Sequence, residues 1–599
     1  MKKIIYLSMA ILAMGFFTAC DIDDVENLTE LSTSVFPATD DDATAVIAAV
    51  YQNLNLVNAN PQCSFLYAAC LASDDQLGGG GDNDKLMQAL DLMLNYGSDM
   101  TSQFWSDRYT GIARANNVIS SLEVNESMSE DTRNRYIAEA KFLRAFYYYE
   151  LSSFYGNVPL ALNSEDDAYQ NSDFETGIKE IWAQILTDLV YACENMADER
   201  YTDGHVDKYT AEAMLARAYL FYTGFFCNGF TIEAMASEDY NRLTSAPLND
   251  GETLTDSQVQ AYLEDCVNNS GYYLVPDFRN LWAYTNSYTV DDYQYTAGQG
   301  LEWVENDGAV NPESMFAIKF NKYASWSTTI GYANGYALHF SCRGGQSVDE
   351  SGTFPFGQGW GAGPVAPGLY EDWVAAEPND MRIKATIAVT SDTTDMKAYT
   401  KGGWGDFVQE TDYYGKKWSA ISALVDTTSS DYETYGSAVY CFETLMYPGN
   451  WDTSGENNFQ LSNIHDLVLI RFADALLMLS EISGDAQYMN QVRARAGLSD
   501  KSYSLENLQN ERRWELACEG IRWNDIRRWH IAQTALAAQQ DVTCYHAGAE
   551  DTNSAHGGGY VSRYQATAGF QAMPDTQLDL AVVSQNEGWG TSVSTYSGW

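Results

Sequence analysis

Apolar residues recur at helical spacing over two long parts of the chain, one before about residue 225 and one after about residue 465. In the earlier part this pattern predicts helices over residues 40–55, 105–119, 139–155, 178–196 and 209–223. The helix over 139–155 is apolar on most sides. Phe142 and Tyr149 lie on one of its faces, and Leu143 and Phe154 lie on another. We therefore expect this helix to be packed between neighbours and not laid on a surface.

The later part predicts a helical hairpin. An apolar helix over Asp466–Ser480 stops at Gly484, and a second helix over 485–496 stops at Gly497. Glycine just past a helix is typical, because it takes a positive φ without a steric penalty. The short connection makes the two helices antiparallel. Helix pairs that recur in this way, at irregular spacing, predict a mainly α fold of tetratricopeptide-like pairs and not a regular solenoid.

Three glutamates, Glu511, Glu515 and Glu519, follow at i, i+4 and i+8 on one predicted helical face. Like charges at this spacing oppose each other by roughly 0.2–0.5 kcal/mol per pair, so we expect arginine partners. The neighbouring candidates are Arg471, Arg512, Arg513, Arg522, Arg527 and Arg528. A carboxylate pair for acid–base catalysis is the alternative interpretation. Nearby cations keep carboxylates ionised and poor as general acids, which favours a structural ion network.

Between about residues 229 and 462 the helical periodicity fades, and Gly, Ser, Thr, Asn and aromatic residues dominate. This composition predicts a large loop-rich, aromatic-rich insertion with short helices and a few strands over the helical base. In the earlier part, the four consecutive glycines Gly78–Gly81 predict a mobile loop. They are not a phosphate-binding loop, because no Lys-Ser/Thr pair follows them. No metal-site or catalytic motif stands out elsewhere, so we expect no cofactor and no metal site.

The N-terminus has the form of an export signal. Met1-Lys2-Lys3 is basic, and the apolar run that follows, residues 4–17, is too short to span a bilayer. The junction before Cys20 resembles a lipobox, in which this cysteine becomes the lipidated first residue. No other segment approaches a membrane span. The expected mature protein is therefore tethered by acyl chains and otherwise soluble.

Charge and cysteine content limit the partners and the kinds of site that the protein can have. The formal net charge of −48 argues against nucleic acid and anionic membrane surfaces as partners, and it suits a neutral ligand outside the cell. The ten cysteines show no C-x-x-C pair, which argues against a zinc site or a disulfide scaffold. Cys193 and Cys518 fall in helical patterns, so we expect them to be buried packing residues.

The order E-R-R-x-E-L-A-x-E-G-x-R-x-x-D-x-x-R-W over 511–529, after Gln491-Val-Arg-Ala-Arg-Ala-Gly497, closely resembles the C-terminal signature of the SusD/RagB family. The segments 105–119 and 139–160 also resemble motifs of that family. Its members are nutrient-binding outer-membrane lipoproteins. The resemblance implies one compact body with four parts: a signal peptide (1–19), an N-terminal helical region (20–228), a loop-rich ligand-facing region (229–462) and a C-terminal helical region (463–599).

The same resemblance implies a function and a partner. Such a protein covers a SusC-like TonB-dependent transporter of the outer membrane and faces the cell exterior. The acidic run behind Cys20 resembles the surface-export signal of the family's host bacteria. The protein captures an oligosaccharide, or in some members a peptide or glycoprotein fragment, and passes it to the transporter. The expected mechanism is binding and hinge motion, without covalent chemistry.

Aromatic loops on a rigid scaffold suit carbohydrates. The apolar face of a sugar ring stacks on Trp or Tyr, and its hydroxyls need polar partners. By the resemblance, the ligand face combines the loop-rich region with the early loop at 74–84. The predicted ligand-binding residues, each in a Gly- or Asn-flanked context that favours exposure, are Asp75, Asn83, Trp282, Tyr284, Trp326, Trp360 and Trp404.

Two other classes of protein remain open from the sequence. A surface glycoside hydrolase would need two facing carboxyl groups about 5–9.5 Å apart in a cleft. An adhesive surface protein would bind no small ligand at all.

Overall fold

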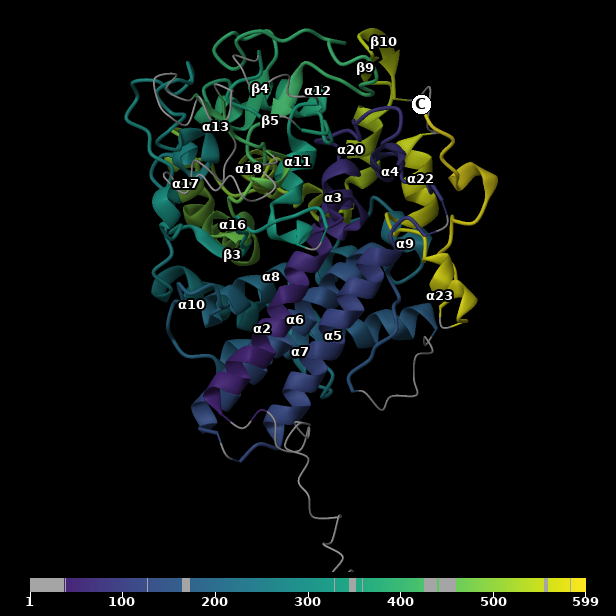
Figure 1. Cartoon of the computed structure of the whole chain (residues 1–599). Coiled ribbons are helices and arrows are strands. Elements are labelled where there is room, and N and C mark those ends of the chain that lie inside the picture. The colour runs from purple at the N-terminus through teal and green to yellow at the C-terminus, as the bar shows by residue number, and fades with distance from the viewer. Residues whose placement is uncertain are drawn as a thin grey trace, which may run out of the picture.

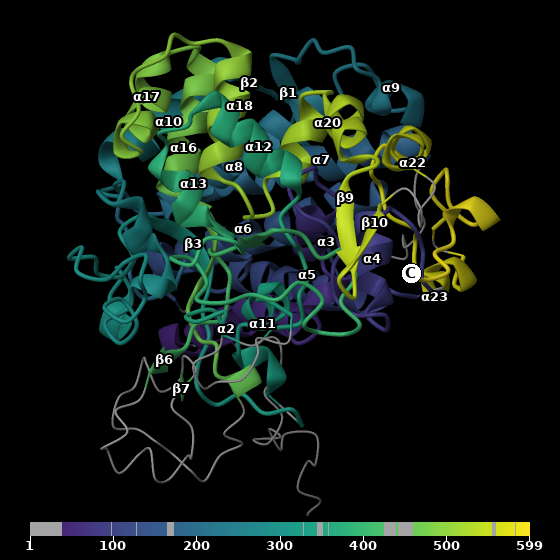
Figure 2. The same cartoon turned by 90° about the horizontal axis from the view of Figure 1, so that it is seen from above.

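The computed structural model describes residues 37–599 apart from 38, 98, 127, 164–172, 328, 344–351, 358, 425–438, 441–458, 554–558 and 582. The described chain is mostly helical and has five short two-stranded sheets, which confirms the mainly α fold. Figures 1 and 2 show the long early helices gathered on one side of the molecule and the shorter elements on the other. The predicted signal peptide, Cys20 and the acidic run behind it lie outside the described residues.

The N-terminal helices form the base of the molecule. They are α2 (Asp40–Asn58), α3 (Phe65–Leu71), α4 (Lys85–Asp91), α5 (Ser102–Glu123), α6 (Glu130–Tyr155), α7 (Phe174–Asn195) and α8 (Lys208–Phe225). From α5 to α8 each helix packs on the next, as predicted for helix pairs. Helix α6 begins after Ser129, whose side chain accepts from the backbone of Thr132, and it ends at Gly156 with φ +78°. Its side chains are buried on all sides beyond its first turns, because α2, α5 and α7 surround it.

The region after α8 contains short elements, as predicted. They are α9 (Ile232–Ala236), β1 (Ser245–Pro247), β2 (Thr253–Thr255), α10 (Asp256–Asn269), β3 (Ser314–Ile318), α11 (Gly335–Phe340), α12 (Pro367–Ala376), α13 (Met381–Thr386), β4 (Ile387–Val389), β5 (Tyr413–Gly415), β6 (Ala423–Leu424) and β7 (Val439–Tyr440). Helix α10 packs on α8 and on the later helix α16 (Phe472–Ser483), so this part of the region extends the helical base.

The C-terminal part differs from its prediction at its start. Residues predicted as the first turns of a helix form strand β8 (Leu467–Arg471), and helix α16 begins only at Phe472. Strand β8 pairs antiparallel with β3, which lies about 150 residues earlier, and this pairing is what makes the Leu-Val-Leu-Ile run extended. Gly484 ends α16 with φ +66°, as predicted.

The remaining elements follow in order. They are α16 (Phe472–Ser483), α17 (Ala486–Arg495), α18 (Leu505–Glu515), α19 (Arg522–Arg528), α20 (Ala532–Gln539), β9 (Thr543–His546), β10 (Ala549–Thr552), α22 (Tyr560–Thr567) and α23 (Asp575–Asp579). Helices α16 and α17 form the predicted hairpin. The main hydrophobic core contains residues from Ala43 to Tyr596, so the two ends of the described chain share it. Cys193 and Cys518 are buried, as predicted.

The four glycines Gly78–Gly81 lie outside helices and strands, as predicted, but they are packed between other segments and do not form the loose loop that was expected. All four are buried, and the segment forms bridges with Ala362 and Phe407. Gly79 has φ +71°, and a Cβ atom there would lie 2.1 Å from the carbonyl oxygen of Gly361. Glycine is required at this point by both the backbone conformation and the close approach of two chain segments.

Candidate ligand-binding site

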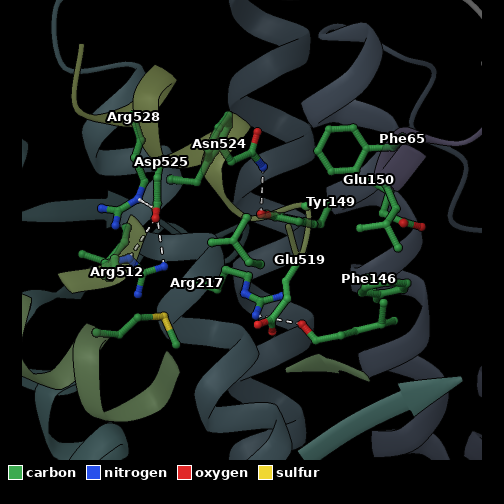
Figure 3. A pocket seen from close by; sticks show the side chains of 17 residues that line it. Phe65, Phe146, Tyr149, Glu150, Arg217, Arg512, Glu519, Asn524, Asp525 and Arg528 are labelled. Atoms are coloured by element: carbon green, nitrogen blue, oxygen red, sulfur yellow. Dashed lines mark hydrogen bonds and ion pairs between the residues drawn. The ribbon is translucent and has the colours of Figure 1, made fainter. Parts of the chain in front are cut away.

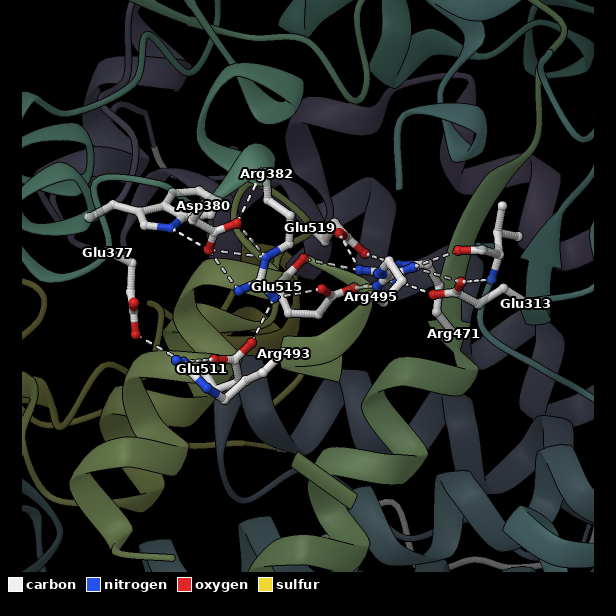
Figure 4. A network of polar contacts seen from close by, with 12 residues as sticks. Glu313, Glu377, Asp380, Arg382, Arg471, Arg493, Arg495, Glu511, Glu515 and Glu519 are labelled. Carbon is white, nitrogen blue, oxygen red and sulfur yellow. Dashed lines mark hydrogen bonds and ion pairs between the residues drawn. The ribbon is translucent and has the colours of Figure 1, made fainter. Parts of the chain in front are cut away.

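The glutamates of the C-terminal signature lie in a buried ion network (Figure 4). Arg471, at the end of β8, is its central cation. Its Nε and Nη2 atoms each lie 2.8 Å from Glu519, and its Nη1 lies 2.6 Å from Glu313 and 2.9 Å from Glu515. The fifth N–H donates to the backbone oxygen of Glu515 at 3.1 Å. All five donors of this guanidinium are therefore used.

Further arginines extend the network. The side chain of Arg382, from α13, is fully buried, and its Nη1 lies 2.7 Å from Glu511 and 2.9 Å from Glu515. Arg493 and Arg495 reach in from α17: the former lies 2.8 Å from Glu511, and the latter pairs with Glu515. Three separate segments of the chain thus meet on the carboxylates of α18.

The predicted structural network is confirmed, with different partners from most of those expected. Of the six candidate arginines, Arg471 alone pairs with these three glutamates within the described ion pairs. Arg512 binds Asp474 and Asp525, Arg513 binds Asp74, Asp75 and Asp372, Arg522 binds Asp74, Arg528 binds Glu481 and Asp525, and Arg527 donates to backbone oxygens. The other cations of the network are Arg382, Arg493, Arg495 and Lys417, and they come from elements whose position the local pattern does not reveal.

The electrostatics of this network argue against acid–base chemistry. Burial alone would raise the pKa of Glu515, but Arg495, Arg471 and Arg382 hold it well below its ordinary value. The pKa of Glu519 is also lowered, by Arg471 and Lys417 against the effect of burial. Both groups therefore stay ionised at neutral pH and have no proton to give.

An internal cavity lies beside this network, between α3, α6, α8 and α19 (Figure 3). Apolar rings such as Phe65 and Phe146 and charged groups such as Arg217 and Asp525 line it together. It leaves about 50 Å³ for water, which is room for a few molecules. Ligand sites are usually about 300–1,000 Å³, so this cavity is too small for a sugar.

A cluster of polar and aromatic side chains around Arg343 lies at the surface. The Nη1 atom of Arg343 lies 2.8 Å from Asp84, and its Nη2 lies 2.9 Å from Asp406. Its guanidinium carbon is 6.0 Å from the centre of the Trp404 ring, and Nη1 also donates to the backbone oxygen of Trp360 at 3.1 Å. We call these five residues the Arg343 cluster.

Backbone pairing between distant segments holds the Arg343 cluster in place. The N–H of Gly80 donates to the backbone oxygen of Gly361, and the N–H of Val408 donates to that of Gly80. Asp84 is therefore held beside the strand-like stretch that carries Trp360. A turn bond from the N–H of Phe407 to the oxygen of Trp404 fixes the tryptophan loop. The hairpin β9–β10 packs against that loop, and its His546 reaches Asp82 at 2.8 Å.

Exposure decides which groups of the cluster a ligand meets. The side chain of Arg343 is only 15% exposed, whereas those of Asp84 and Asp406 are 26% and 37% exposed. Trp404 is 41% exposed. Trp360 is half-buried, and the ring of His339 packs on it at a tilt of 36° with ring centres 4.2 Å apart. The surface therefore offers carboxylate oxygens and one open indole face, with the cation behind them.

Three predicted site residues lie in or beside this cluster. Trp360 and Trp404 belong to it, and the exposed Asn83 lies between Asp82 and Asp84. Trp326 is 39% exposed, on the loop that leads through η6 (Ile330–Tyr332) to α11 and Arg343. Ligand contact at all four remains a prediction.

For the other three, the predicted exposure is wrong. Asp75 is buried and pairs with Arg513 at 2.8 Å. Trp282 is buried in the core of the loop-rich region, where the ammonium of Lys417 lies 4.9 Å from its ring centre. Tyr284 is fully buried, and its hydroxyl donates to the backbone oxygen of Ala385.

No sequence motif points to three members or neighbours of the cluster, which are Arg343, Asp406 and His546. One signal for Arg343 exists in the sequence: it is the one Lys or Arg between Lys322 and Arg382, in a stretch rich in glycine and aromatic residues. A lone cation in such a stretch marks a polar contact point. Asp406 and His546 have no comparable local signal, since their contacts with Arg343 and Asp82 join residues 63 and 464 positions apart.

The fold and this surface define a protein with a stiff helical base whose exposed polar and aromatic groups lie on loops. Residues 36–220 match the model of a family described as "Starch-binding associating with outer membrane", and residues 268–589 match that of the SusD family. The chain belongs to the SusD family, as its C-terminal signature predicts.

Known relatives agree with this assignment. SusD-like protein P2 of Formosa agariphila is 26% identical over 471 residues, which cover 76% of each chain. A solved laminarin-binding SusD-like protein has a TM-score of 0.64 at 23% identity and covers 92% of this chain and 99% of its own. Surface glycan-binding protein A from Bacteroides thetaiotaomicron, solved with laminarihexaose, has a TM-score of 0.63 at 20% identity and covers 92% of this chain and all of its own. No helix in the described part of the chain is long and apolar enough to cross a membrane.

Proposed function

We propose that this protein is a cell-surface glycan-binding lipoprotein that delivers an oligosaccharide to a partner TonB-dependent transporter of the outer membrane. The observation that carries the proposal is the open face of Trp404 beside the carboxylates of the Arg343 cluster, on loops that backbone pairing holds in place. Membership of the SusD family and the names of the glycan-binding relatives support it.

The chemistry of the cluster matches a sugar. An indole face takes up the apolar C–H face of a pyranose ring, and the apolar surface that this contact removes from water contributes roughly 25 cal/mol per Å². Sugar hydroxyls donate readily, and the partly exposed carboxylates of Asp84 and Asp406 accept. The amide of the exposed Asn83 can both donate and accept.

The same cluster favours a neutral glycan over an acidic one. The donors of Arg343 are already directed at Asp84, Asp406 and the Trp360 backbone, so little of its positive charge is left for a ligand carboxylate. The exposed oxygens around it, with Asp82 nearby, would repel uronate or sulfate groups. The net charge of −48 adds to that repulsion.

Binding calorimetry with Trp404→Ala tests the glycan site. A panel of neutral oligosaccharides that includes laminarihexaose is titrated into the wild-type protein, next to acidic oligosaccharides of matched length. The affinity of whichever neutral glycan binds should fall about tenfold in Trp404→Ala. This fall corresponds to a loss of about 1.4 kcal/mol of binding free energy. Tyr273→Ala is the control, because Tyr273 is 54% exposed and has no described contact with the cluster. Equal loss in both variants, or binding of acidic glycans alone, would contradict the proposal.

A second experiment separates binding from hydrolysis. The bound glycan is incubated with the protein, and reducing ends are measured over time. We expect no new reducing ends, because the described glutamates of the C-terminal signature are buried ion-pair members. Release of reducing ends that is lost on mutation of an Asp or Glu pair would identify a glycoside hydrolase instead.

The anchor and the transporter are tested in cells. Cys20→Ser should release the protein from the membrane fraction, because acylation of this cysteine is the proposed tether. The wild-type protein, gently extracted from membranes, should co-purify with a TonB-dependent transporter. Retention of Cys20→Ser in the membrane would contradict the lipid anchor.

A further inference from the structure

Cys227 lies just after the end of α8 and is not a member of the Arg343 cluster. Eight cysteines lie in the described part of the chain; seven of them are buried, and Cys227 is partly exposed. Its Sγ atom lies 3.5 Å from Nε2 of His530, a residue that directly follows α19 and Trp529. A partly exposed nucleophile and a buried potential base, from segments 303 residues apart, are thus paired.

The surroundings of His530 indicate its protonation state. Its Nδ1 lies 2.7 Å from the backbone oxygen of Ser237, and its Nε2 lies 3.2 Å from the oxygens of both Gly224 and Phe225. Carbonyl oxygens only accept hydrogen bonds. A neutral imidazole would direct a lone pair at one of these oxygens, whereas an imidazolium donates to both sides. The two oxygens next to Nε2 also belong to the C-terminal end of α8, which favours a cation.

The sulfur of Cys227 has a matching environment for a negative charge. Besides His530, the backbone N–H of Asn241 interacts favourably with its anionic form. Burial alone would raise the pKa of the Cys227 thiol, but His530 and this N–H bring it below its ordinary value. Burial alone would lower the pKa of His530, and the contacts with Cys227 and with the carbonyl oxygens raise it.

The other charged and titratable groups near the pair have partners of their own. Tyr240 faces His530 with ring centres 6.2 Å apart, and burial raises the pKa of this tyrosine well above its ordinary value, so it stays neutral. Around it, Arg242 pairs with Asp256 and Arg528 pairs with Glu481. Glu238, on the same loop, accepts from Thr534. No described carboxylate therefore competes with Cys227 for His530.

We propose that Cys227 is a modification site, a thiolate paired with the His530 imidazolium that reacts with small disulfides. The thiolate sulfur attacks one sulfur of the disulfide, the S–S bond breaks, and a mixed disulfide forms on Cys227 while the second sulfur leaves as a thiolate. A small thiol reverses the step. Neither an added oxidant nor a metal is needed, and the inference does not depend on glycan binding.

The test uses the whole folded protein and dithiodipyridine, a small uncharged disulfide that the negative charge of the chain does not repel. The release of thiopyridone is followed from pH 5 to pH 10, and the modified peptide is identified by mass spectrometry, which separates Cys227 from cysteines outside the described residues. We expect the adduct on Cys227, with a rate midpoint below the ordinary thiol pKa of about 8.5. Cys227→Ser should abolish this adduct.

His530→Gln separates the pairing from simple accessibility. Glutamine keeps a hydrogen-bond donor but carries no positive charge. At pH 6.5 the variant should therefore react at Cys227 about tenfold more slowly than wild type, or slower still, which corresponds to a rise of about one unit in the pKa of the thiol. At pH 10, where any exposed thiol ionises, the variant should react like the wild type, and this recovery would show that the fold and the access are intact. An absence of adduct on Cys227 at every pH, or the same pH profile in His530→Gln, would overturn the proposal.

Discussion

Replacement of Arg471 by methionine should destabilise the fold strongly. Arg471 directs all five N–H groups at Glu313, Glu515 and Glu519, and its side chain is only 2% exposed. Methionine has a similar length but no charge, so Arg471→Met leaves three buried carboxylates with one cation fewer. Removal of one partner from a buried ion pair typically costs about 3–5 kcal/mol.

The remaining cations set the expected loss within that range. Arg495 still contacts Glu313 and Glu515, and Lys417 still lies 2.6 Å from Glu519. No carboxylate is left without a partner, so we expect a decrease of about 3–4 kcal/mol in the free energy of unfolding. For a chain of this length the unfolding entropy is about 1.2 kcal/mol/K, so the thermal midpoint should fall by roughly 3 °C.

Urea unfolding followed by tryptophan fluorescence, together with calorimetry, measures the effect. Lys179→Met is the matched control, because the pair of Lys179 with Glu175 is 47% and 58% exposed, and such pairs contribute about 0.2–1 kcal/mol. Arg471→Lys should fall between wild type and Arg471→Met, since one ammonium replaces only part of the planar fork. If Arg471→Met lost no more stability than Lys179→Met, the role assigned to the network would be refuted.

Two further predictions concern stability and the loops. Burial raises the pKa of Asp91 to about 7, against about 3.9 in an unfolded chain. Between these two values the folded state binds more protons than the unfolded state. The free energy of unfolding therefore falls as the pH rises from about 4 to 7. The side chain in Asp91→Asn cannot titrate, so the free energy of unfolding of this variant should rise by about 2–4 kcal/mol relative to wild type across that pH window. Parallel curves of stability against pH for the two proteins would contradict this. Gly79→Ala should lower the free energy of unfolding clearly more than Gly251→Ala, and it should also weaken glycan binding. Both glycines have positive φ, but only at Gly79 would the new Cβ atom lie 2.1 Å from a backbone oxygen. Equal unfolding midpoints would show that the close approach has no effect.

Much of the fold could be predicted because helical periodicity is local. The all-round apolar pattern after Glu139 predicted a helix packed between neighbours, and α6 is one. The glycines Gly484 and Gly497 predicted the ends of the hairpin, and both have positive φ. The run Leu467–Arg471 was misassigned because its strand partner lies about 150 residues away.

The site could be predicted only in part, for the same physical reason. Flanking glycines and asparagines are a local signal, and they correctly indicated exposure for Asn83, Trp326 and Trp404. They were misleading for Asp75, whose partner Arg513 lies 438 residues away. Residues whose role depends on long-range contacts, such as Arg343 with Asp84, have no periodic pattern that reports the contact.

The buried charges on α18 have a consequence for protein engineering. Glu313 belongs to the loop-rich region, yet its counterions Arg471 and Arg495 come from β8 and α17. Arg382 of the same region pairs with Asp380 nearby, but also with Glu511 and Glu515 of α18. A truncated chain that ends before β8 would remove both described cations of the buried Glu313 and leave Arg382 with Asp380 alone, so we expect the binding loops not to fold as a separate module. Grafts that alter specificity should instead exchange only the outer turns, such as the one that bears Trp404, and leave the buried ion network unchanged.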